Sequence, residues 1–186
     1  AMFGILEFQT RGMALNKDRK AKGLPPIKTI YGCHIYVDTS GANAKEPATY
    51  ERLTLLVESE KGYYNLLRIV SYRYEESKRW EEIPSVPLSV IEAHKEGLIA
   101  IAGDYFSRYG MNVSAGRESL AKAYMESLCE IFDKEHLYLS LCDNGIAAQK
   151  TLNLFTMALA KELDRELVAV GDVHYINKAD SDADIM

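Results

Sequence analysis

Hydrophobic and polar positions alternate along the chain with two different periods, and these periods predict strands and helices. Short apolar segments rich in β-branched and aromatic residues predict strands at 29–37, 52–59, 98–104, 136–143 and 166–176. Segments with apolar residues three and four positions apart predict helices at 3–15, 63–80, 88–97, 116–133 and 147–164. Strands and helices therefore alternate over most of the chain. This order is typical of an α/β fold with a mostly parallel sheet covered by helices, as an open sheet or a barrel.

Signals that end helices separate these segments. The paired prolines of 22–28 (KGLPPIK) end the first helix, which is predicted to be amphipathic with Phe3, Leu6, Met13 and Ala14 among its apolar positions. Gly97 is a candidate C-cap for the short helix that precedes it. The polar connection 38–50 is too short for a comfortable crossover helix. The sequence therefore leaves the geometry between the first two strands open.

Length and composition describe one ordinary globular domain. The 186 residues suffice for a single hydrophobic core, and we treat 1–186 as one segment in which Ala1, before Met2, is the remnant of a cleaved tag. Three cysteines without a CxxC spacing predict small buried thiols in a reducing compartment. There is neither a secretory signal nor an apolar segment long enough to span a membrane, so a cytoplasmic location is expected.

The charge balance argues against direct binding of nucleic acid by this segment. Acidic residues outnumber basic ones, 27 to 22, whereas binding to phosphate backbones depends on a concentrated basic surface. The one dense basic cluster, 16–23, is diluted by Asp18 and is typical of a solvated loop or helix end.

Polar residues with metal-binding chemistry occur near the carboxyl ends of the apolar strands. His34 lies on the first predicted strand, Asp104 ends the third, and Asp172 and His174 end the last. In parallel α/β folds this is the edge where active sites assemble, and all four are legitimate ligands for one divalent ion. An ordinary structural interpretation stays open for each, because an aspartate at a strand end often caps the following turn and a histidine in a strand is often a hydrogen-bonded core residue.

Six segments occur in an order that closely resembles one known family. They are MFGILEFQ, YGCHIYV, RLTLLVESEKGYYNLLRIVS, GLIAIAGD, LYLSLCDNG and AVGDVHYI. The family is the PHP (polymerase and histidinol phosphatase) domain found at the N-terminus of the bacterial DNA polymerase III alpha subunit. The resemblance runs over nearly the whole chain, and 52–71 is its most specific part.

The resemblance implies a distorted seven-stranded, TIM-like (β/α)7 barrel with a metal site gathered from several strand ends. This chain begins inside the segment that follows the family's first two strands, so an incomplete barrel without those strands is expected. The family's Gly-Cys-Glu is replaced by Gly32-Cys33-His34, and Arg52 stands where the family often has a histidine. Asp104 replaces a family cysteine, and Asn144 a family histidine. Only Asp172 and His174 match the family's ligands outright.

These departures favour a remnant metal site over a catalytic centre. The resemblance then implies a non-catalytic segment of a replicative DNA polymerase, a nucleotidyltransferase whose polymerase chemistry lies elsewhere in its subunit. Its expected work in DNA replication is structural support of the rest of that subunit and docking of the proofreading exonuclease. We expect no required cofactor, although His34, Asp104, Asp172 and His174 could retain residual zinc, manganese or iron.

Two alternatives remain, and one physical consequence is common to all. One alternative is a metal-dependent phosphoesterase or proofreading exonuclease, in which bound ions activate water. The other is a free-standing binding protein descended from the family. In each case, a barrel without two strands would expose two sheet edges, so self-association through those edges is expected.

Overall fold

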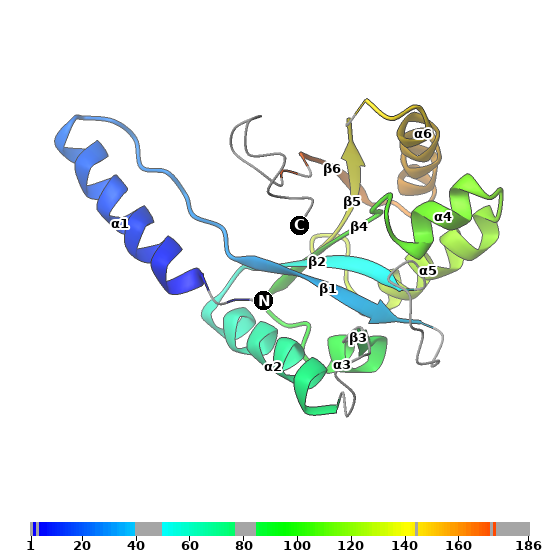
Figure 1. Cartoon of the computed structure of the whole chain (residues 1–186), viewed down its shortest axis with the longest axis horizontal. Coiled ribbons are helices and arrows are strands. Elements are labelled where there is room, and N and C mark those ends of the chain that lie inside the picture. Colours follow the sequence, from blue (N-terminus) through cyan, green and yellow to red (C-terminus); the bar gives the residue numbers. More distant parts are fainter. Residues whose placement is uncertain are drawn as a thin grey trace, which may run out of the picture.

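The structure is a computed structural model that describes residue 2 and residues 4–39, 50–76, 85–143, 145–171 and 173. Six strands in this part of the chain form one sheet in the order β3-β1-β2-β4-β5-β6 (Figure 1). Their bounds are β1 Gly32–Asp38, β2 Glu51–Val57, β3 Ser85–Pro87, β4 Leu98–Ala102, β5 Leu137–Cys142 and β6 Glu166–Val170.

Strand β2 runs against the direction of the other strands. It pairs antiparallel with β1 on one side and with β4 on the other. The pairs β1–β3, β4–β5 and β5–β6 are parallel. The sheet is therefore mixed. The sequence left the geometry between the first two strands open, and the structure shows that they are antiparallel. An antiparallel pair needs no crossover helix, so the residues between β1 and β2 are long enough to join them.

Side-chain alternation divides the sheet into a buried face and an open face. The buried face carries the hydrophobic core, because residues in register across the strands point to the same side. Its buried strand residues include Cys33, Ile35, Val37, Leu53, Leu55, Val86, Leu98, Ala100, Ala102, Leu137 and Leu139. The open face shows a row in register formed by His34, Thr54, Ile101 and Tyr138, none of which is buried.

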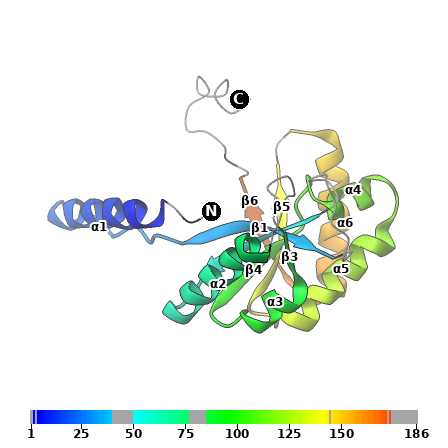
Figure 2. The ribbon, with the colours of Figure 1, turned by 60° about the horizontal axis from the view of Figure 1, so that its bottom comes forward.

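Helices cover the buried face, as Figure 2 shows for α2 to α6 beneath and beside the strands. Their bounds are α2 Glu60–Glu76, α3 Leu88–Ala93, α4 Arg108–Ser114, α5 Glu118–Ile131 and α6 Ala147–Glu162. Leu66, Ile69, Leu128 and Leu159 are among the helix residues that complete the core. The predicted long helices therefore form where the apolar period indicates, with ends displaced by a few residues.

Helix α1 (Ile5–Ala21) differs from the others because it projects from the sheet as an arm (Figures 1 and 2). The side chain of Asn16 ties it to the returning chain, accepting a hydrogen bond from the backbone N–H of Ile27 at 2.7 Å and donating one to its carbonyl at 2.9 Å. No described residue of α1 is buried, and Leu6 and Met13 remain 72% and 68% exposed. A helix is confirmed here, but the prediction that it is amphipathic is wrong. Leu6 and Met13 lie on roughly the opposite side of the helix from Phe8 and Leu15, and none of the four is buried.

Two elements and one helix end escaped the sequence analysis. Strand β3 lies between two predicted helices, and α4 lies between a predicted strand and a predicted helix. The C-cap of α3 is His94 rather than Gly97. Gly97 has a φ of +74° and instead precedes β4, beside Gly62.

Candidate functional site

The candidate site lies at the edge of the sheet where the parallel strands β4, β5 and β6 end. A cavity of about 470 Å³ opens there on the open face. It is lined by His34, Arg52, Thr54, Ile101, Gly103, Asp104, Tyr105, Phe106, Ser140, Cys142, Gln149, Val170, Gly171 and Val173. Because β2 is antiparallel, its first residues lie at the same edge, which brings Arg52 into the cavity. Two of the four residues considered as ligands, His34 and Asp104, therefore line the same cavity.

Asp104 is held by contacts on both sides of its carboxylate. One nitrogen of the Arg52 guanidinium, Nη1, lies 3.3 Å from Oδ1 and 3.1 Å from Oδ2. Oδ1 also accepts a hydrogen bond from the backbone N–H of Phe106 at 2.6 Å. The preceding Gly103, with a φ of +110°, turns the chain close to Ser140. Asp104 thus serves as both the cap of the turn before α4 and the partner of a cation.

His34 has a different partner on the neighbouring strand. Its Nδ1 lies 2.8 Å from the hydroxyl oxygen of Thr54, the residue opposite it in the β1–β2 register. His34 and Asp104 therefore share one cavity but are bonded to different groups. The other two predicted ligands, Asp172 and His174, lie outside the described residues, as does Asn144.

The described donors do not fit a divalent metal ion. Within the described residues, no group of three or more His, Cys, Asp or Glu side chains lies in an arrangement that could hold one. His34 and Asp104 are two donors, and a permanently charged guanidinium lies against both oxygens of Asp104. The predicted four-residue cluster as a whole stays a prediction, because half of it is not described.

A buried carboxyl group that sequence reasoning missed lies just behind this edge. Glu51 is only 2% exposed, and its Oε2 accepts a hydrogen bond from the backbone N–H of Tyr109 at 2.8 Å. Burial raises the pKa of Glu51 from 4.5 to about 7, against the opposing effect of the Tyr109 hydrogen bond. The signal was present in the sequence, because Glu51 alternates with the apolar Leu53 and Leu55 on one strand face.

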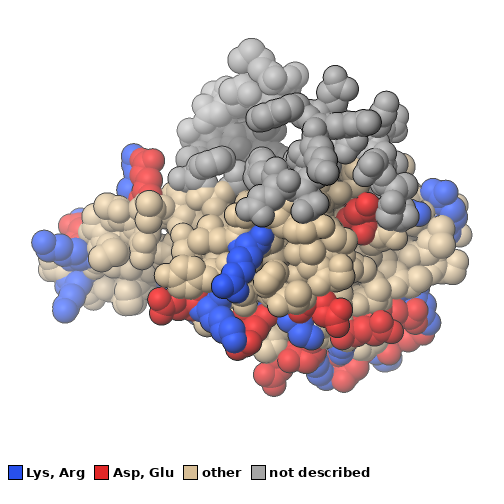
Figure 3. Space-filling view, turned by 90° about the horizontal axis from the view of Figure 1, so that it is seen from below, with Lys and Arg blue, Asp and Glu red and all other residues tan. Residues whose placement is uncertain are grey.

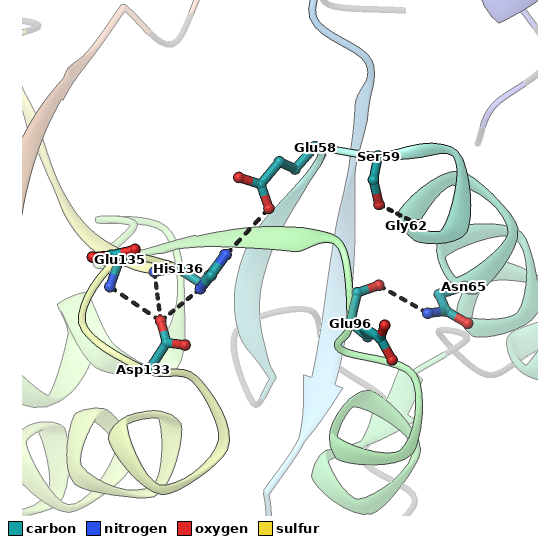
Figure 4. Close-up of polar contacts among 8 residues, drawn as sticks. All are labelled: Glu58, Ser59, Gly62, Asn65, Glu96, Asp133, Glu135 and His136. Carbon is teal, nitrogen blue, oxygen red and sulfur yellow. Dashed lines mark hydrogen bonds and ion pairs between the residues drawn. The ribbon is translucent and has the colours of Figure 1, made fainter.

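A second polar cluster lies at the opposite edge of the sheet (Figure 4). The imidazole of His136 is placed between two carboxylates: its Nδ1 lies 2.6 Å from Asp133 and its Nε2 lies 3.1 Å from Glu58. The hydrogen bond with Asp133 is the main reason why the pKa of His136 is raised. Both ring nitrogens are engaged, so the cluster joins the end of β2 to the turn before β5. His136 therefore has a structural role at this edge.

Comparison with known proteins agrees with the family that the sequence resembles. The family model of the PHP domain matches residues 1–144. A protein named DNA polymerase III subunit alpha from Deinococcus radiodurans is 32% identical over 165 residues, covering 84% of this chain and 12% of the relative. Proteins of the same name from Treponema pallidum and Thermus aquaticus are 29% and 27% identical, covering 97% and 98% of this chain.

The chain spans 12–15% of the length of these relatives. The match of the family model extends from the arm helix α1 through β5, and thus includes the cavity residues His34, Arg52 and Asp104. On this match, and on the mixed α/β sheet that carries the cavity at its strand ends, the chain belongs to the PHP domain family.

Proposed function

We propose that this chain works in bacterial DNA replication as a non-catalytic PHP-domain segment of a DNA polymerase III alpha subunit in the cytoplasm. The observation that carries the non-catalytic part is the ion pair between Arg52 and Asp104 in the cavity at the strand ends. Hydrolysis of phosphoesters by bound metal ions needs several ligands around each ion and an open coordination position. A guanidinium paired with one of the expected ligands opposes that arrangement.

Support of a larger subunit fits the exposed apolar surface of the arm. Leu6, Phe8, Met13 and Leu15 on α1 are all exposed, and the relatives are several times longer than this chain. A protein partner that surrounds the projecting arm would remove these side chains from water. We propose that the rest of an alpha subunit covers this arm.

The same proposal includes the expected barrel. The open face of the sheet and the two terminal strands, β3 and β6, support a PHP-type distorted barrel in which further strands pair with these edges. In an isolated segment the edge of β6 would instead pair with a second copy. The third proposed contact, docking of the proofreading exonuclease subunit, rests on the family resemblance.

The charge of the chain is consistent with binding to protein partners rather than to nucleic acid. The net charge is −5, and on the face shown in Figure 3 acidic side chains are interleaved with basic ones along the lower margin. No described helix is both long and apolar enough to cross a membrane. We propose that protein partners, not DNA or RNA, bind this segment directly.

A binding experiment tests the proposal with purified components. The immobilised chain is mixed with the polymerase region of an alpha subunit and, separately, with the exonuclease subunit. We expect both to be retained, and we expect Leu6→Glu with Phe8→Glu to reduce retention of the polymerase region. Leu154→Glu on α6 is the matched control, because Leu154 is 66% exposed but lies away from the arm. Failure to retain either protein would contradict the proposal.

Metal-dependent phosphoester hydrolysis is the second candidate function, and the 470 Å³ cavity at the strand ends favours it. It requires stoichiometric zinc, manganese or iron and hydrolysis of a simple phosphoester that His174→Ala abolishes. Protein that carries no metal after purification without chelators, and gains no hydrolysis when each ion is added, would rule it out.

A further inference from the structure

Arg52 enters the cavity from β2, which runs against the other strands that the structure describes. It is the second residue of β2, and it lies opposite Tyr36 in the pairing with β1. Asp104 lies two residues after the end of the neighbouring strand β4. The two residues are 52 positions apart in sequence, so the antiparallel pairing of β2 with β4 is what brings them together.

The contact is partly removed from water. The Arg52 and Asp104 side chains are 21% and 24% exposed, so both charges are partly desolvated and each depends on the other for compensation. An arginine in a protein keeps its proton, so this positive charge is present at every physiological pH. A histidine in the same place could become neutral near physiological pH and admit another cation.

The guanidinium lies where a metal ion bound to Asp104 would compete with it. Its Nη1 contacts both carboxylate oxygens of Asp104. One of them, Oδ1, also accepts a hydrogen bond from the backbone N–H of Phe106. A divalent cation at Asp104 would have to displace these donors and remain beside a permanent positive charge. His34, on the same cavity, has its Nδ1 bonded to Thr54.

We propose that Arg52 is a built-in cation that takes the place of a metal ion in this cavity and excludes divalent metals from His34 and Asp104. The guanidinium neutralises Asp104 and holds the turn between β4 and α4. Removal of its charge would leave a carboxylate and an imidazole in one cavity and restore metal binding. This inference deepens the non-catalytic part of the proposed function, but it involves no partner protein.

Metal binding by charge-altered variants tests the proposal. Wild type, Arg52→His and Arg52→Lys are stripped with chelator, then dialysed against zinc or cobalt, and bound metal and the cobalt absorption spectrum are measured. We expect no stoichiometric binding by the wild type or Arg52→Lys, because both keep the positive charge. We expect about one zinc ion per chain for Arg52→His, which adds a third ligand beside His34 and Asp104. Asp104→Asn in the Arg52→His background is expected to abolish that binding.

Two results would overturn the proposal. The first is a wild-type chain that binds one zinc ion and loses it on His34→Ala or Asp104→Asn. The second is folded Arg52→His protein that binds no more zinc than Arg52→Lys. Far-UV circular dichroism checks folding, and if Arg52→His does not fold, the wild-type titration with His34→Ala and Asp104→Asn still decides. A failed pull-down with the polymerase region leaves these metal measurements unaffected, so the two proposals fail separately.

Discussion

The carboxyl group of Glu51 accepts a hydrogen bond from the backbone N–H of Tyr109 at 2.8 Å, and it does so while almost fully buried. The backbone N–H of Arg108 donates to the carbonyl of Tyr50 at 3.1 Å, and the hydroxyl of Ser107 donates to the carbonyl of Asp104 at 2.7 Å. The start of β2 therefore fixes the start of α4. Because Asp104 lies in the turn before α4, this contact also positions the carboxylate that Arg52 pairs with.

The raised pKa of Glu51 predicts a loss of stability as pH increases. The folded chain holds the proton to about pH 7, whereas the unfolded chain releases it near 4.5. Between these values the folded state binds more protons, so the free energy of unfolding falls as pH rises, by roughly 3 kcal/mol in total. Below about pH 4.5 this contribution is fully present.

Urea unfolding of the wild type and Glu51→Gln between about pH 5 and about pH 8 measures this effect. The glutamine can still accept the Tyr109 hydrogen bond but does not titrate, so the stability difference between the two proteins should change across this window. An identical pH dependence for both would show that Glu51 is ionised in the folded chain at pH 5. Tyr109 is an unsuitable control, because its hydroxyl bonds Thr156 at 2.9 Å within the same buried region.

His136 predicts a second, smaller pH effect. Its folded pKa is raised above 6.5, so its contribution is fully present below that value and is lost as pH rises through the folded pKa. The ring is partly exposed and Glu58 and Asp133 are more so, which screens these pairs and limits the contribution to about 1 kcal/mol or less. We expect His136→Asn to destabilise the chain at low pH and to have less effect in alkaline buffer.

Chemical denaturation at about pH 6 and about pH 9 checks this expectation. His94→Asn is the matched control, because His94 is a partly buried histidine that ends α3 and forms no ion pair with the residues that the structure describes. A His136→Asn defect of equal size at both pH values would mean that neutral packing, not the charged histidine, provides the stabilisation.

The close approach of α2 to the start of β4 predicts that Gly62 tolerates no side chain. A Cβ atom at this position would lie 1.8 Å from the carbonyl oxygen of Gly97, which is backbone and cannot rotate away. Gly62→Ala should therefore lower the free energy of unfolding by about 1–3 kcal/mol, as expected for an overpacked position. Gly4→Ala is the control, because a Cβ there meets nothing within 4 Å. Equal thermal melting temperatures for both variants would contradict the prediction.

The free edge of β6 predicts self-association of the isolated chain. Strand β6 ends the sheet, pairs only with β5 among the described strands, and exposes 38% of Leu167. An edge of this kind is a template for a second strand. We expect light scattering to give a mass above that of one chain, and Leu167→Lys to shift the protein toward the monomer. Leu154→Lys is the control, and a wild-type monomer at all concentrations would contradict the prediction.

Local pattern in the sequence determined most of the elements. The apolar periods located β1, β2, β4, β5 and β6 and the helices α2, α5 and α6, because period and secondary structure are linked by backbone geometry. The alternation of Glu51 with Leu53 and Leu55 also indicated that the carboxyl group of Glu51 is buried. The resemblance of six segments to the PHP family was likewise local, and the family match bears it out.

Only the tertiary structure decided which strands meet and in which direction. The reversal of β2 depends on pairing between distant segments, and no local period encodes it. The seven-residue helix α4 and the three-residue strand β3 are too short to give a periodic signal, and α4 depends on Glu51 for its start. The exposure of α1 follows from the arm's position rather than its sequence. The pairing of Arg52 with Asp104, and with it the character of the cavity, exists because an antiparallel strand delivers its first residues to the edge where its parallel neighbours end.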